Sequence, residues 1–138
     1  GFHMARALAL GADGCNSARA MMLSIGCIQA LQCNMNTCPT GVATQNKSLI
    51  KGLVVDDKAP RAKNYHEATI HSFLELIAAA GLDGPQDLRR EHISKRVGMY
   101  IVKTYDEIYP YMEEGCLLDI ADIPDTYKRY FQLTRIMK

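Results

Sequence analysis

The sequence lacks the features that would place it at a membrane or on a nucleic acid. No apolar run approaches the roughly 20 residues of a membrane-spanning helix, and residues 1–25 lack the charged start and uninterrupted apolar centre of a signal peptide. The 16 basic and 15 acidic residues are interspersed and leave a formal charge of +1, which indicates no electrostatic footprint for either partner. We therefore expect a cytoplasmic protein that binds neither nucleic acid nor membrane.

The sequence also has no pair of cysteines two residues apart, the spacing typical of structural zinc sites. Its five cysteines are an odd number in a chain without a secretion signal, which argues against a disulfide framework and favours reduced thiols or metal ligands. Three of them, Cys27, Cys33 and Cys38, fall within twelve residues at the spacing C-x5-C-x4-C. Cys15 and Cys116 lie in other contexts, where we expect small core residues.

Three thiols on one short segment are compatible with three kinds of site. A three-iron cluster has one cysteine per iron, and Pro39 directly after Cys38 matches the Cys-Pro ending of ferredoxin-type sequences. Structural zinc would need a fourth ligand. The candidates for that ligand are the four histidines, His3, His66, His71 and His92. The third interpretation is a set of apolar thiols with no ligand. The spacing favours iron–sulfur and leaves the other two open.

The sequence around these cysteines resembles a known family. The resemblance is carried by residues 8–13 (LALGAD), 26–28 (GCI) and 36–45 (NTCPTGVATQ), together with Cys33. These segments are similar to the synthase domain of glutamate synthases, most of all to stand-alone FMN-binding glutamate-synthase-like proteins. The similarity extends over about residues 1–96.

The resemblance implies an α/β fold, the C-terminal part of an FMN-binding (β/α)8 barrel. Strong helix formers over residues 2–10 predict a helix that stops at Gly11, and residues 19–25 predict another. Residues 12–18 between them read as a brief buried strand. A complete barrel takes about 250 residues, so we expect a piece of a longer enzyme, mostly α-helical and with only a vestige of sheet.

Three segments are expected along the chain. Residues 1–45 would be the end of the barrel with the iron–sulfur loop, residues 46–96 a loop and helices after the cluster, and residues 97–138 a helical C-terminal extension. Further helices are predicted over residues 60–80, 85–89, 105–109 and 125–137. We expect the last of these to pack on the barrel exterior or on a neighbouring subunit.

The resemblance also gives candidate cofactor ligands. Barrel flavoenzymes hold phosphate with loops after the last strands and with free N–H groups of a short helix. In glutamate synthases the corresponding turn is Gly-x-Gly-Thr, and here Asn16, Ala18 and Arg19 replace the two glycines and the threonine. By resemblance, Ser17, Ala18 and Arg19 are expected to hold the FMN phosphate. Without it, the turn reads as a capped helix start with a solvated arginine.

The resemblance implies an oxidoreductase that acts on CH–NH2 donors. In the family, ammonia from glutamine condenses with 2-oxoglutarate, reduced FMN passes hydride to the imine, and a 3Fe-4S cluster relays electrons. Cys27, Cys33 and Cys38 match the cluster ligands residue for residue, and Asn34, Asn36 and Thr37 are candidates for hydrogen bonds around them.

The other functional residues of the family lie upstream of this segment. We therefore name no catalytic residue and expect the chain alone to be inactive. Its expected partners are the upstream barrel segment and an electron-donor subunit or ferredoxin. Two other classes stay open: a related barrel flavoenzyme subunit such as an N-methylglutamate-forming one, and a non-enzymatic zinc or electron-transfer module.

Overall fold

The chain forms two compact units, and one long helix, α3 (Val55–Ala79), is the main element of the first. The computed structural model describes residues 1–119 and 121–136, with side chains described as far as residue 130. The first unit comprises Gly1–Ile93 and the second Ser94–Lys138. None of the described helices is both long enough and apolar enough to cross a membrane.

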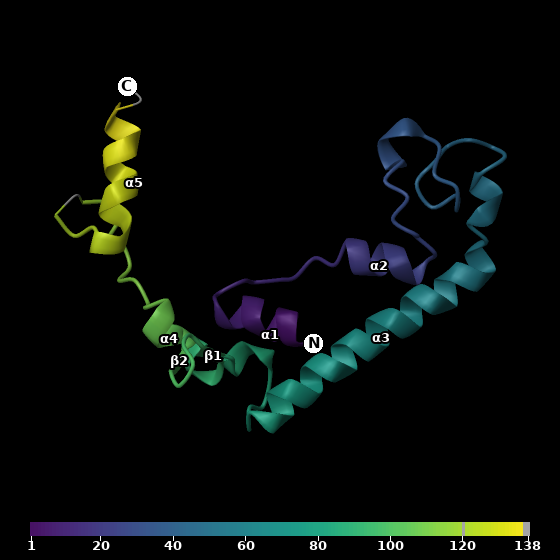
Figure 1. Cartoon of the computed structure of the whole chain (residues 1–138). Helices are drawn as coiled ribbons and strands as arrows, with labels where there is room; N and C mark the ends of the chain where they lie inside the picture. Colours follow the sequence, from purple (N-terminus) through teal and green to yellow (C-terminus); the bar gives the residue numbers. More distant parts are fainter. Residues whose placement is uncertain (120, 137–138) are drawn as a thin grey trace. The chain divides into compact units, whose positions relative to one another are not determined.

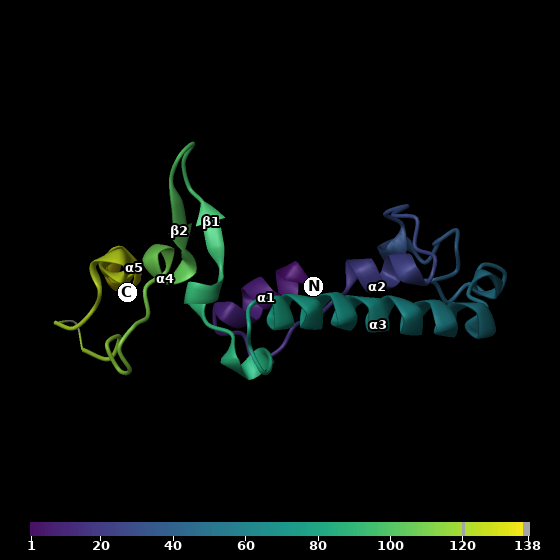
Figure 2. The ribbon, with the colours of Figure 1, turned by 90° about the horizontal axis from the view of Figure 1, so that it is seen from below.

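Two shorter helices, α1 (Phe2–Ala9) and α2 (Arg19–Ser24), pack along α3 (Figures 1 and 2). Small residues on one face of α1 allow this close approach, because Gly1, Ala5 and Ala9 are four residues apart and share that face. Ala5 and Ala9 are buried, and a side chain at Gly1 would collide with the backbone of Ser72 on α3.

The core of the first unit is small. Phe73 and Ile77, one turn apart on α3, are 4% and 3% exposed. Leu88 and Ile93 are also buried and belong to the segment that follows α3, which contains two short 3-10 helices, Pro85–Asp87 and Arg90–His92. Among the described residues no large side chain is fully enclosed. Few buried contacts therefore hold this unit together.

The predicted helix ends are confirmed. α1 ends at Ala9, where residue 10 followed by Gly11 was predicted, and α3 ends at Ala79, where residue 80 followed by Gly81 was predicted. The predicted start of α3 at residue 60 was five residues late. Pro60 lies inside the helix and removes one backbone hydrogen bond, whereas Asp56 and Asp57 in the first turn interact favourably with the helix dipole.

The predicted strand at residues 12–18 was wrong. This segment is irregular and runs from α1 to α2 (Figure 1). A strand needs a neighbouring strand for its N–H and C=O groups, and the described part of the first unit contains none. Helices make up about half of the described chain, and its one sheet has two strands. The described residues show no barrel, so the (β/α)8 architecture stays a prediction.

The second unit begins with a β-hairpin that the sequence did not predict. Strands β1 (Ser94–Arg96) and β2 (Val102–Thr104) pair antiparallel, with Lys95 directly opposite Lys103 (Figure 2). The tip is apolar and open to solvent, since Met99 is 76% and Tyr100 90% exposed. The hairpin therefore combines a like-charge pair with an uncovered apolar tip.

Helix α4 (Tyr105–Ile108) follows β2 directly and has the predicted capping box. Glu107 accepts hydrogen bonds from the backbone N–H of Thr104 at 2.7 Å and from its hydroxyl at 3.0 Å. Tyr105 is buried and meets the ring of Tyr109 edge to face, with the centroids 5.4 Å apart. Helix α5 (Asp125–Ile136) agrees with the predicted terminal helix, whose last predicted residue, Met137, lies outside the described residues.

Candidate functional site

The first cysteine of the trio is positioned by the end of α2. Gly26 has a φ of 106° and its N–H donates to the carbonyl of Leu23 at 3.1 Å, while the N–H of Cys27 donates to that of Met22 at 3.0 Å. This pair of bonds is a Schellman motif, which satisfies the last carbonyls of a helix and reverses the chain. Cys27 therefore opens the cysteine loop, residues 27–45, from a fixed backbone position.

The backbone between the cysteines is unusual. Among the described residues, three other than glycine have positive φ, and all three lie between Cys27 and Cys38: Gln29 at 57°, Leu31 at 56° and Asn36 at 59°. The left-handed conformation is unfavourable for leucine and glutamine and persists only where the surroundings hold it. Cys33 starts the 3-10 helix Cys33–Met35 within this stretch, and its side chain is exposed.

Cys38 lies in a pocket of hydrogen-bond donors. Its side chain is buried, and its sulfur is 3.4 Å from the hydroxyl oxygen of Thr40. That hydroxyl, followed by the backbone N–H of Ala43 and with smaller help from those of Thr40 and Val42, lowers the pKa of the Cys38 thiol from 9.0 to about 7. Burial acts in the opposite direction. The donors outweigh burial, so this site favours a negatively charged sulfur.

Two glycines bring the segment after Cys38 against the start of α3. A side chain at Gly41 would collide with the carbonyl oxygen of Leu49 and lie 3.1 Å from the backbone nitrogen of Leu53. A side chain at Gly52, in the 3-10 helix Ile50–Gly52, would lie 2.6 Å from the carbonyl oxygen of Thr40. Backbone packs directly on backbone here, and Gly41 also has a positive φ of 77°.

Side-chain hydrogen bonds close the second part of the cysteine loop, residues 36–45. The side-chain oxygen of Asn36 accepts from the backbone N–H of Gln45 at 2.6 Å and from the hydroxyl of Thr44 at 2.9 Å. The same hydroxyl lies 2.6 Å from the carbonyl oxygen of Asn36. We call these contacts the Asn36 clamp. Nearby, the Thr37 hydroxyl donates to the side chain of Gln32 at 3.2 Å.

The three sulfurs do not form one ligand set in this structure. In the part of the chain that the structure describes, no three His, Cys, Asp or Glu side chains are close enough together to hold a metal ion. The donor chemistry nonetheless fits an iron–sulfur centre, because three thiols share one loop and the environment of Cys38 stabilises an anionic sulfur. The cluster ligands Cys27, Cys33 and Cys38 therefore stay a prediction.

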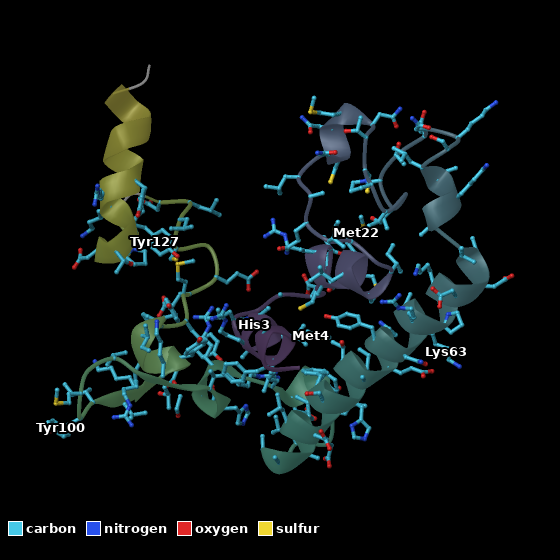
Figure 3. All side chains as sticks on the ribbon, turned by 45° about the vertical axis from the view of Figure 1, so that its right-hand side comes forward. His3, Met4, Met22, Lys63, Tyr100 and Tyr127 are labelled. Atoms are coloured by element: carbon cyan, nitrogen blue, oxygen red, sulfur yellow. The ribbon has the colours of Figure 1, made fainter. Side chains whose placement is uncertain are left out.

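The residues expected to bind the FMN phosphate lie between α1 and α2. Ser17 lines a hollow of about 460 Å³ bordered by α1 and α3, whose wall includes His3 and Met4 (Figure 3) and Tyr65. Ala18 and Arg19 are exposed and do not line that hollow. Arg19 is the first residue of α2, and Ala18 precedes it without a side-chain cap. All three residues are exposed, and of the three only Ser17 lines the hollow.

The remaining candidates lie apart from the trio. No histidine joins a metal-sized group within the described chain, and Nδ1 of His92 accepts the backbone N–H of Arg89 at 2.9 Å. His71 lies 3.6 Å from Glu75 on the surface of α3. Cys15, expected in the core, is exposed and lines the same hollow as Ser17, because residues 12–18 are not covered by a sheet. Cys116 is half-buried in the second unit.

Sequence reasoning missed two hydroxyl side chains, Thr40 and Thr44. Thr40 could have been found from its position, since it comes two residues after Cys38, a spacing at which a hydroxyl commonly reaches back to its neighbours. Thr44 gave only a weak signal, because its partner Asn36 is eight residues away.

Comparison with known proteins identifies the family. The family model described as a conserved region in glutamate synthase matches residues 1–83, which includes the whole cysteine loop. The chain thus belongs to the glutamate synthase family. No solved structure matches it.

Named relatives agree with this assignment. The chain is 48% identical over 93 residues to the glutamate synthase large subunit-like protein YerD of Bacillus subtilis, covering 67% of the chain and 18% of that protein. It is 37% identical over 84 residues to the archaeal glutamate synthase [NADPH] of Methanocaldococcus jannaschii, covering 61% of the chain and 16% of that enzyme. For the archaeal-type glutamate synthase [NADPH] of Thermotoga maritima the identity is 32% over 96 residues, covering 69% of the chain and 19% of that enzyme. The chain therefore spans less than a fifth of each of these relatives.

Proposed function

We propose that this chain is the C-terminal part of the synthase region of a glutamate synthase-type oxidoreductase. In this proposal Cys27, Cys33 and Cys38 hold a 3Fe-4S cluster, and the turn at Ser17, Ala18 and Arg19 contributes to the FMN phosphate site. The observation that carries the proposal is the position of three thiols on one loop inside the region that the family model matches, with the sulfur of Cys38 3.4 Å from the hydroxyl oxygen of Thr40. Family membership supports flavin and iron–sulfur cofactors in general.

Bound flavin and cluster would supply hydride and electron transfer for reducing the imine of 2-oxoglutarate and ammonia to glutamate. This chain's own contribution is to hold sulfur ligands and to surround them with hydrogen-bond donors. The hydroxyl oxygen of Thr40 lies 3.4 Å from the sulfur of Cys38 and can donate to its thiolate, and the backbone N–H of Gln29 donates to the sulfur of Cys27 with an N···S distance of 3.4 Å. Such donors favour the anionic form that iron requires of its cysteine ligands.

A partner surface is part of the proposal. Apolar side chains of the cysteine loop are open to solvent, with Leu31 85%, Met35 67% and Ile28 64% exposed. Several large apolar side chains exposed on one loop are consistent with a surface that is covered in an assembly. We assign this surface to the upstream barrel segment. The names of the archaeal-type relatives support NADPH as the source of electrons, delivered directly or through an electron-donor subunit.

The test is metal analysis of the intact protein that contains this chain, purified without oxygen. We expect iron, a broad brown absorption band and yellow flavin bands, and we expect Cys27→Ser, Cys33→Ser and Cys38→Ser each to lose the iron. Cys116→Ser is the matched control and should retain it. A colourless protein that contains zinc, or iron that survives all three substitutions, would overturn the proposal. Glutamate formed from 2-oxoglutarate identifies the reaction, and a different amino-acid product would reject it.

A further inference from the structure

We propose that Asn36 is a positioning residue that sets the path of the chain between Cys33 and Cys38 and so determines whether both sulfurs can bind one centre. The proposal rests on the proposed function for the identity of that centre. Its structural part, the closure of the cysteine loop by the Asn36 clamp, is independent of any metal.

The backbone of Asn36 makes the first contribution. Asn36 ends the 3-10 helix Cys33–Met35 and has φ and ψ of 59° and 23°, in the left-handed region. Asparagine is one of the few residues other than glycine that adopts this conformation readily. The chain changes direction at this residue, three positions after one proposed ligand and two before the next. A residue that avoids the left-handed region would redirect both.

The side chain makes the second contribution. An asparagine that merely formed a turn would bond its own neighbouring backbone. Asn36 instead reaches Thr44 and Gln45, eight and nine residues further along. The contacts close a ring of ten residues, 36–45, which includes the buried Cys38. The Thr44 hydroxyl also accepts the N–H of Asn46 at 3.1 Å, which fixes its orientation.

A hollow beside the clamp connects it to the second proposed ligand. Asn36, Thr44 and Gln45 line a hollow of about 440 Å³ together with Cys33. The clamp therefore borders the same hollow as the exposed Cys33 and closes the segment that carries the buried Cys38. Opening it would free residues 36–45 to move relative to Cys33, since these hydrogen bonds join the two ends of that segment.

Two pairs of variants test the side-chain contribution. Asn36→Gly keeps the left-handed backbone and removes the acceptor, and Asn36→Asp keeps both. Thr44→Val removes the hydroxyl at nearly constant size, and Thr44→Ser keeps it. In the metal-free chain, amide hydrogen exchange at Gln45 and alkylation of Cys38 report the state of the clamp, and circular dichroism reports the helices.

We expect Asn36→Gly to raise the exchange rate of Gln45 about tenfold, because two hydrogen bonds are lost, with helix content unchanged. Alkylation of Cys38 should accelerate in the same variant. Thr44→Val should have a smaller effect, and Asn36→Asp and Thr44→Ser should restore wild-type behaviour. Unchanged Gln45 exchange in Asn36→Gly would overturn the clamp.

The second measurement is iron release to a chelator from the intact protein, prepared without oxygen. Loss of a residue that orients metal ligands typically weakens metal binding about 10- to 100-fold, so Asn36→Gly should release iron faster by that order and Asn36→Asp should not. If wild-type protein binds iron and Asn36→Gly releases it at the same rate, the positioning role is wrong and the proposed function stands. If wild-type protein binds no iron, the proposed function and the role assigned to Asn36 both fail, and only the clamp in the metal-free chain is retained.

Discussion

The hydroxyl oxygen of Thr40 lies 3.4 Å from the sulfur of Cys38, and this contact is the main reason that the Cys38 thiol has a pKa of about 7. Replacing Thr40 by valine removes the hydroxyl at nearly constant size. The pKa should rise toward 9.0, the value of a cysteine thiol without these interactions. Since the thiolate is the reactive form, alkylation of Cys38 at pH 7 should slow about fivefold.

The measurement is the pH dependence of Cys38 alkylation in metal-free protein, read by mass spectrometry of the modified peptide. Thr40→Ser is the control and should keep the low pKa. The same shift has a consequence for stability. Because the folded pKa lies below the unfolded one, the stabilisation is fully present above pH 9 and is lost as the pH falls to about 7. An unchanged alkylation profile in Thr40→Val would assign the low pKa to the backbone donors alone.

Gly41 and Gly81 allow conformational strain to be separated from steric collision. Both have positive φ, at 77° and 73°, but only at Gly41 would a side chain meet other backbone atoms. We expect Gly41→Ala to destabilise the packing on Leu53 by about 2 kcal/mol more than Gly81→Ala destabilises its own turn. Amide exchange at Leu53 measures the first and exchange at Leu82 the second. Equal effects would mean that backbone contact at Gly41 contributes nothing.

Phe73 and Leu74 are adjacent on α3 and differ in burial, at 4% and 48% exposed. Phe73→Ala should cost about 3 kcal/mol or more, because it leaves a cavity in a core with few buried side chains. Leu74→Ala should cost under about 1 kcal/mol. Urea unfolding followed by circular dichroism measures both. A Phe73→Ala variant that is unfolded before urea is added agrees with the prediction, and equal midpoints for the two variants contradict it.

Lys95 and Lys103 face each other across the hairpin of the second unit. Like charges directly opposite on an antiparallel pair are destabilising, and an opposite-charge pair is favourable. Lys103→Glu should therefore slow amide exchange within β1 and β2 by about two- to fivefold, an effect that added salt weakens. Lys103→Gln, which removes only the repulsion, should give a smaller change. Faster exchange in Lys103→Glu would contradict the prediction, because it would show that repulsion between the two lysines does not destabilise the hairpin.

Local signals made the helices predictable. Gly11, Gly26 and Gly81 each follow a helix, and each has a positive φ that glycine adopts easily. The capping box of Thr104 and Glu107 was equally readable, because both partners lie within one turn. Such features depend on neighbours in sequence, and they formed where the residues indicated.

Features that depend on distant partners were not predictable. The strand expected at residues 12–18 failed because a strand is completed by another strand. The hairpin at β1 and β2 was missed because its strands have three residues each and include Lys95, Arg96 and Lys103, which give no alternation of apolar and polar residues. The cysteine spacing indicated a shared site, but the donors around Cys38 depend on how residues 40–43 fold back on it.

Cys27 and Cys38, the first and last cysteines of the trio, are each connected to the start of α3. Cys27 follows the cap of α2, and the Lys58 side chain of α3 passes next to Gly26. Gly41, three residues after Cys38, packs on the backbone of Leu49 and Leu53, just before α3 begins at Val55. Both connections reach the first turn of α3 or the segment just before it, whereas Cys33 lies in the 3-10 helix between them. Helix α3 therefore links the two ends of the segment that carries all three thiols.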